Sequence, residues 1–195
     1  MFPVGGVGVM LLGAVLSGLA CLGLALAVRR RTGWTWAASL GLFVWSLIGL
    51  ALVTLLPANG APGIVSAEGR LDYCSWDIGG PAPDGFWILP GGQRLLNMVV
   101  FVPSGALLVL VAARWRRSAW VTVPIGFALL AGYSVLIEIT QLALARLDRA
   151  CDVTDMIDNV TGAAIGVLLG VVLALVLRPW RSREVSGGVR RPSAR

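Results

Sequence analysis

The chain has 195 residues, of which 57% are hydrophobic and 13% are charged, and its net charge is +6. This composition is too apolar for an ordinary soluble domain of the same length, so that class is excluded. The positive charge does not indicate nucleic-acid binding, because most of the arginines flank long apolar runs, where anionic lipid head groups are expected. The composition therefore predicts an integral membrane protein whose main partner is the lipid bilayer.

Five apolar runs follow one another along the chain, and each is close to the roughly 20 helical residues that cross a bilayer core. Because lipid offers the backbone no hydrogen-bond partners, we expect helices rather than open strands. The first run has its arginines after it rather than before it, so we interpret it as a retained helix and not a signal peptide. The sequence predicts an all-α membrane bundle of five transmembrane helices, at residues 4–28, 34–56, 95–113, 119–145 and 159–177.

The placement of the arginines predicts the orientation of this bundle. If the helices alternate across the membrane, residues 29–31, residues 114–117 and the arginines from Arg178 onward fall on one side. The positive-inside rule then places the N-terminus outside and the C-terminus inside a multi-pass protein of the cell membrane. Residues 1–178 would form the membrane domain, and the polar residues 179–195 a disordered basic cytoplasmic tail.

The three cysteines allow two interpretations. Cys21 lies within the first predicted helix, whereas Cys74 and Cys151 lie in the two outer loops. In an oxidising exterior compartment, Cys74 and Cys151 could form a disulfide. From the sequence alone we favour two unpaired thiols, and the disulfide stays the alternative.

Polar side chains that are unusual for membrane spans occur at one depth in the last three predicted helices. At 1.5 Å per residue, each of them falls close to the outer end of its helix. We therefore expect them to meet near the outer leaflet. They are Asn97 in the third helix, Glu138 and Gln141 in the fourth, and Asp152, Asp155 and Asn159 in the fifth.

Helical phase supports this convergence. On a wheel of 100° per residue, Ser134, Glu138 and Gln141 occupy about 60° of the fourth helix. If the last segment is helical from residue 152 onward, three polar residues and three glycines share an arc of about 80°. Glycines at every fourth position let a neighbouring helix approach closely, so the polar residues above them would point into the bundle. The residues of this arc are Asp152, Asp155, Asn159, Gly162, Gly166 and Gly170.

Several of these polar residues also have simpler structural interpretations. Asp152, with Asp155 three residues later, resembles a capping box, and we expect Asp152 to cap a helix. Asp158 falls outside the 80° arc, so we expect a solvated or interfacial charge, like Arg146 and Asp148 in the adjoining loop.

Glu138 is harder to explain structurally, because a carboxylate inside a span is costly unless it is paired, protonated or functional. Arg149 or Arg146 is the alternative structural partner of Glu138. Asn97 and Gln141 could simply link helices by hydrogen bonds. We favour a functional role for Glu138, and it is the catalytic candidate if the chain is an enzyme.

Three ordered motifs resemble those of the VanZ-like family, bacterial multi-pass membrane proteins named for a teicoplanin-resistance protein. The stretches are "NMVVFVPSG", "IEITQ" and "RACDVTDMIDNVTGAAIG", within residues 94–177. Ser104 departs from the pattern, where a larger aliphatic residue is common, and Asp158 is an extra acid. The matching residues are Asn97, Phe101, Pro103, Gly105, Glu138, Gln141, Arg149, Asp152, Asp155, Asn159, Gly162 and Gly166.

The resemblance implies a protein of the cell envelope, associated in some members with glycopeptide tolerance, and it implies no established reaction. Our first hypothesis is an outer-leaflet pocket that binds a lipid-linked or cell-wall-related ligand, such as a cell-wall precursor or a glycopeptide, and that affects teicoplanin susceptibility. Arg149 would pair with a phosphate or carboxylate of that ligand. The ligand-binding candidates are Asn97, Glu138, Gln141, Arg149, Asp152, Asp155 and Asn159.

Two alternatives give Glu138 a different role. In a metal-assisted hydrolase or transferase acting on an envelope lipid, Glu138 would be the general base. In a small transporter, Glu138 would carry the coupling proton. No cofactor is predicted, and Asp152 and Asp155 are only weak candidates for a hard metal ion such as Mg²⁺.

Overall fold

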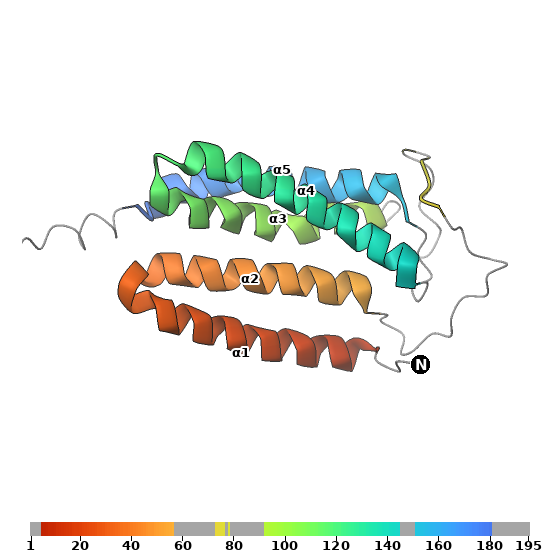
Figure 1. Ribbon diagram of the computed structural model, residues 1–195, viewed down its shortest axis with the longest axis horizontal. Coiled ribbons are helices and arrows are strands. Elements are labelled where there is room, and N and C mark those ends of the chain that lie inside the picture. Colours follow the sequence, from red (N-terminus) through yellow and green to blue (C-terminus); the bar gives the residue numbers. More distant parts are fainter. Residues whose placement is uncertain (1–4, 57–72, 77, 79–91, 145–150, 181–195) are drawn as a thin grey trace, which may run out of the picture.

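A computed structural model describes residues 5–56, 73–76, 78, 92–144 and 151–180 (Figure 1). Each of its long helices is long and apolar enough to cross a membrane, which confirms the predicted all-α, multi-pass membrane fold. The orientation, with the N-terminus outside, stays a prediction. The helices are α1 (Val7–Thr32), α2 (Trp34–Leu55), α3 (Gly92–Ala112), α4 (Ala119–Leu144) and α5 (Val153–Leu177), and the short 3-10 helix η2 (Ala113–Trp115) follows α3.

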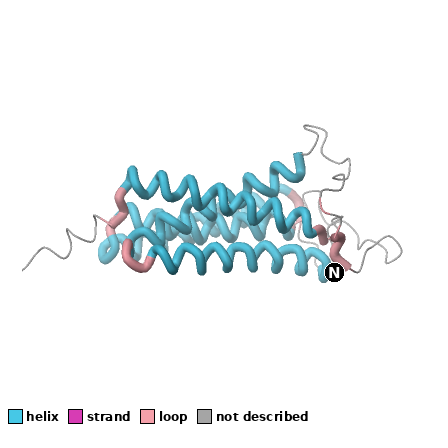
Figure 2. Tube along the Cα trace, turned by 90° about the horizontal axis from the view of Figure 1, so that it is seen from above, coloured by secondary structure: helices cyan, strands magenta, loops and turns pink. Residues whose placement is uncertain are grey.

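The helices lie side by side, and their connections gather at two ends (Figures 1 and 2). The disulfide end carries the start of α5 and a disulfide between Cys74 and Cys151. The opposite end, which we call the arginine end, holds the α1–α2 turn, η2 and the end of α5. Its described arginines are Arg29, Arg30, Arg31, Arg114, Arg116, Arg117 and Arg178.

Helix boundaries follow local chemistry more closely than hydropathy. α1 continues through its three arginines to Thr32, because cations are favourable near the negative end of a helix dipole. Gly33 ends it with φ 86°, a conformation that favours glycine, and its N–H donates to the Arg29 oxygen at 2.8 Å. α5 begins at Val153 rather than at residue 159, because Asp152 caps it.

α3 and α5 form the closest helix pair, and they run in the same direction. The glycines of α5 lie against the backbone of α3: a Cβ atom on Gly162 would collide with the Met98 oxygen, and one on Gly166 with the Val102 oxygen. A Cβ atom on Gly170 would lie 2.6 Å from the Ala106 oxygen. The predicted glycine face is therefore confirmed, and its partner is α3.

The apolar core lies where α2, α3 and α4 meet the α3–α5 pair. Phe101 and Ile137 are fully buried there, and Leu50, Leu108 and Leu130 pack around them. Polar links cross the same region: the Ser46 and Ser104 hydroxyls are 3.0 Å apart, and the Tyr133 hydroxyl donates to the Leu47 oxygen at 2.8 Å. These contacts hold α4 and α2 against α3, and they position the α4 residues that face the disulfide end.

Candidate functional site

A strap across the disulfide end positions the start of α5. Cys74 and Cys151 are bonded although 77 residues separate them in the sequence. Beside the disulfide, the Ser75 N–H donates to the Cys151 oxygen at 2.8 Å, and the Val153 N–H donates to the Ser75 oxygen at 3.1 Å. Our expectation of two unpaired thiols is therefore wrong, because the segment near Cys74 returns to pair with residues 151–153 as a short parallel bridge.

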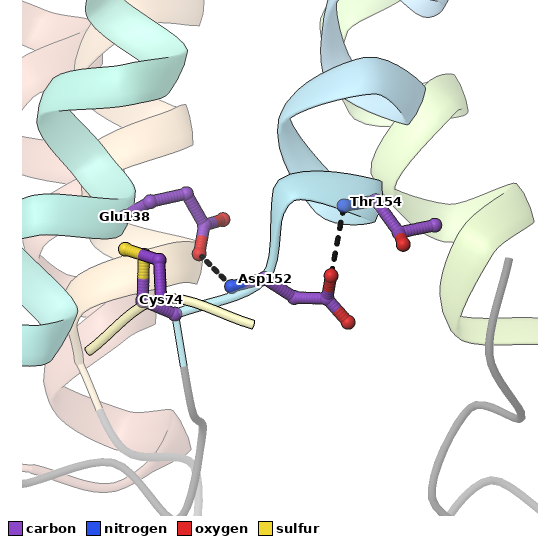
Figure 3. Close-up of a disulfide and its surroundings, with 5 residues drawn as sticks. Cys74, Glu138, Asp152 and Thr154 are labelled. Atoms are coloured by element: carbon purple, nitrogen blue, oxygen red, sulfur yellow. Dashed lines mark hydrogen bonds between the residues drawn. A yellow bond between two sulfur atoms is a disulfide. The ribbon is translucent and has the colours of Figure 1, made fainter. Parts of the chain in front are cut away.

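Asp152 connects this strap to α4. Its Oδ1 accepts the Thr154 N–H at 2.8 Å, so the predicted helix cap is confirmed. Its own N–H points to Oε2 of Glu138 at 3.4 Å, and Figure 3 shows the disulfide beside this contact. The cap side chain and the backbone of one residue thus serve α5 and α4 at the same time.

The predicted polar arc of α4 faces the interior. Glu138 is 3% exposed and Gln141 is 2% exposed. Ser134 is fully buried and accepts a hydrogen bond from Nδ2 of Asn159 on α5 at 3.0 Å. Nε2 of Gln141 donates to the Thr54 oxygen of α2 at 2.8 Å. The α4 arc therefore links α5 on one side and α2 on the other.

Two buried amide atoms of this region have no hydrogen-bond partner within the described residues. They are Nδ2 of Asn97, a donor on α3, and Oε1 of Gln141, an acceptor on α4. Asn97 is only 7% exposed. Leaving such a group unpaired in a protein interior costs about 1–3 kcal/mol, so these atoms are candidates for contact with a ligand or with water.

Asp158 is not the solvated charge that we expected. Its side chain is 4% exposed and forms a two-point ion pair with Arg94, at 2.9 and 3.0 Å. Asp158 lies one turn before Gly162 and Arg94 one turn before Met98, so the pair continues the α3–α5 contact row outward. The wheel placed Asp158 outside the arc because the arc was centred on the glycines and not on this i, i+4 row.

Sequence reasoning missed Arg94 as a member of the site. Its guanidinium also interacts electrostatically with the carboxylates of Asp152 and Asp155. Spacing by four residues along both helices was the available signal, since Asp158, Gly162 and Gly166 match Arg94, Met98 and Val102 in order. Matching the two rows would have placed the ion pair.

The remaining predicted residues are partly outside the described chain. Arg149 lies outside the described residues, as do Arg146 and Asp148. Asp155 is half-buried in the first turn of α5. In the described ranges, no group of three or more His, Cys, Asp or Glu side chains could hold a metal ion. The site that the structure brings together is therefore a hydrogen-bonding cluster with four carboxylates and one arginine.

Comparison with known proteins places this arrangement in a family. The VanZ/LLP1 family model matches residues 43–175, from within α2 almost to the end of α5. The match is wider than the motif resemblance, which covers residues 94–177. Searches of curated proteins and of solved structures find no match. The motifs, the glycine-packed helices and the family model agree, and the chain, a multi-pass membrane protein, belongs to the VanZ/LLP1 family.

Proposed function

We propose that the polar cluster at the disulfide end binds the head group of a lipid-linked or cell-wall-related ligand. The observation that carries the proposal is the pair of unpartnered amide atoms on Asn97 and Gln141, both buried between membrane helices. Buried polar groups are almost always hydrogen-bonded, and polar residues within membrane bundles commonly mark substrate sites. A donor and an acceptor on facing helices suit a ligand that offers both.

The charges of the cluster narrow the ligand class. Among the described residues, Arg94 is the one base beside the carboxylates of Glu138, Asp152, Asp155 and Asp158. An acid-rich rim favours hydrogen-bond donors such as sugar hydroxyls, amides or an ammonium group over a bare phosphate. Phosphate binding would require Arg149, as the sequence motif predicts. Altered teicoplanin susceptibility is the expected cellular consequence.

A general-base role for Glu138 in a hydrolase or transferase is the second candidate. The supporting observation is its carboxylate, which is 3% exposed and accepts the Asp152 N–H at the edge of the cluster. Glu138→Gln separates the two functions, because the amide keeps an oxygen for the Asp152 N–H but cannot accept a proton from a substrate. Retained ligand with lost turnover would favour the enzyme.

Mass spectrometry of lipids that co-purify with the protein tests the binding proposal. We expect wild type to retain a specific envelope lipid or precursor, and Asn97→Leu/Gln141→Met to lose it while remaining folded. The matched control is Ser46→Ala/Ser104→Ala, which removes another interhelical hydrogen bond but no atom of the cluster. If wild type and both double variants carry the same bulk lipids, the binding proposal is wrong.

A further inference from the structure

A second site lies at the arginine end, away from the polar cluster. There α3, α4 and α5 enclose a groove of about 470 Å³, within the range of roughly 300–1,000 Å³ that is typical of ligand pockets. Val109 and Ala113 of α3 lie along it, and Val123 of α4 and Val171 of α5 line it as well. The groove is therefore apolar over most of its surface.

The mouth of the groove has a different character. Arg116 lines it together with Trp120 and Trp180. The Arg116 guanidinium lies 5.7 Å from the centre of the Trp180 ring, and Trp120 is 86% exposed. Aromatic side chains beside arginine are typical of the membrane interface. One end of the groove is thus cationic, and the rest is suited to hydrocarbon.

The positive charge at this mouth is not neutralised by the described residues. The described acids are Glu138, Asp152, Asp155 and Asp158, and all of them belong to the disulfide end. Arg114 already donates to the Thr32 oxygen and lies over the ring of Trp36. Arg116 has no carboxylate partner among the residues that the structure describes.

We propose that this groove binds one anionic phospholipid. Its phosphate would contact Arg116, because guanidinium and phosphate form strong charge-assisted hydrogen bonds. Its acyl chain would lie between α4 and α5, along the apolar part of the groove, and basic pockets between membrane helices bind such lipids. By the positive-inside prediction this is the inner leaflet, so the site is separate from the proposed ligand site.

Native mass spectrometry of the purified full chain in detergent tests this proposal. Phosphatidylglycerol and phosphatidylcholine with the same acyl chains are titrated in parallel. We expect wild type to retain one phosphatidylglycerol at least five times more strongly than phosphatidylcholine. Arg116→Gln should remove that preference, whereas Arg117→Gln, the next residue, which does not line the groove, should keep it. Equal retention of the two lipids by wild type would overturn the proposal, as would equal losses in the two variants.

A groove-filling variant tests the acyl part independently of charge. Val171 is 45% exposed, so Val171→Trp should fold while occupying the groove, and Leu175→Trp is the substitute if it does not. Either variant should lose at least fivefold in phosphatidylglycerol retention with all arginines present. Unchanged retention would show that surface charge alone holds the lipid and would contradict the proposal. Glycerol phosphate at the same concentration should not displace the lipid, and displacement would assign the site to a soluble phosphate instead.

Discussion

The α3–α5 pair and the α1–α2 hairpin are both adjacent helix pairs, but they are packed in different ways. In α3–α5, backbone meets backbone at every turn from Gly162 to Gly170. In α1–α2, side chains fill most of the interface: Gly13 faces Leu52 and Gly18 faces the ring of Trp45. Half of the best membrane window of α3 is buried, against 11% for that of α1.

The difference separates a site-bearing unit from a peripheral one. The family model matches residues 43–175 and so leaves α1 outside. The polar cluster is built by α3, α4 and α5, with α2 contributing the Thr54 oxygen. A cluster of buried polar groups requires fixed helix positions, and direct backbone packing provides them. The close α3–α5 contact is therefore the structural condition for the site.

Breaking the α3–α5 contact should have the largest effect. In Gly166→Ala the new methyl group would overlap the Val102 oxygen, and neither backbone can move without separating the helices. We expect a loss of about 4 kcal/mol or more in unfolding free energy, measured by titrating dodecyl sulfate into mild detergent. Gly132→Ala is the matched control, because nothing lies within 4 Å of that position. An equally small effect of both changes would show that the helices do not touch as described.

Removing the strap should have the next largest effect. Cys74→Ser/Cys151→Ser opens a loop of 77 residues in sequence separation, and losing such a cross-link typically costs about 2–4 kcal/mol. Hydrogen exchange should rise most at residues 152–156, where the bridge to Ser75 is lost. Cys21→Ala, which removes the unpaired thiol of α1, should leave that exchange unchanged. Uniform exchange changes along the chain would contradict a local strap.

The Arg94–Asp158 pair should respond unequally to its two single changes. Arg94→Gln leaves a carboxylate that is 4% exposed without its partner, whereas Asp158→Asn leaves a guanidinium that is 42% exposed. After allowance for the exposed side of the pair, we expect a loss of about 2 kcal/mol for Arg94→Gln and below about 1 kcal/mol for Asp158→Asn. The double variant should be no worse than Arg94→Gln. Equal losses in the two single variants would mean that Asp158 is solvated.

Much of this architecture could be predicted from hydropathy and helical phase. The spans, the inward arc of Glu138 and Gln141, and the glycine face of α5 depend on local periodicity, which the sequence contains. The disulfide could not be predicted in the same way, because it depends on the path of a long connection between Leu55 and Gly92. The Arg94–Asp158 pair depends on how two helices align, and a single helical wheel carries no information about that alignment.

The smallest predicted effect concerns the link between α4 and α2. The Tyr133 hydroxyl donates to the Leu47 oxygen at 2.8 Å, and interhelical hydrogen bonds in membranes contribute about 0.6 kcal/mol on average. Tyr133→Phe should therefore cost about that much in the same dodecyl sulfate titration. Thr140→Val is the control, because the Thr140 hydroxyl bonds the Leu136 oxygen of its own helix. If Tyr133→Phe destabilised the protein as much as Gly166→Ala, α2 would belong to the central unit, and the division between a site-bearing pair and a peripheral hairpin would have to be redrawn.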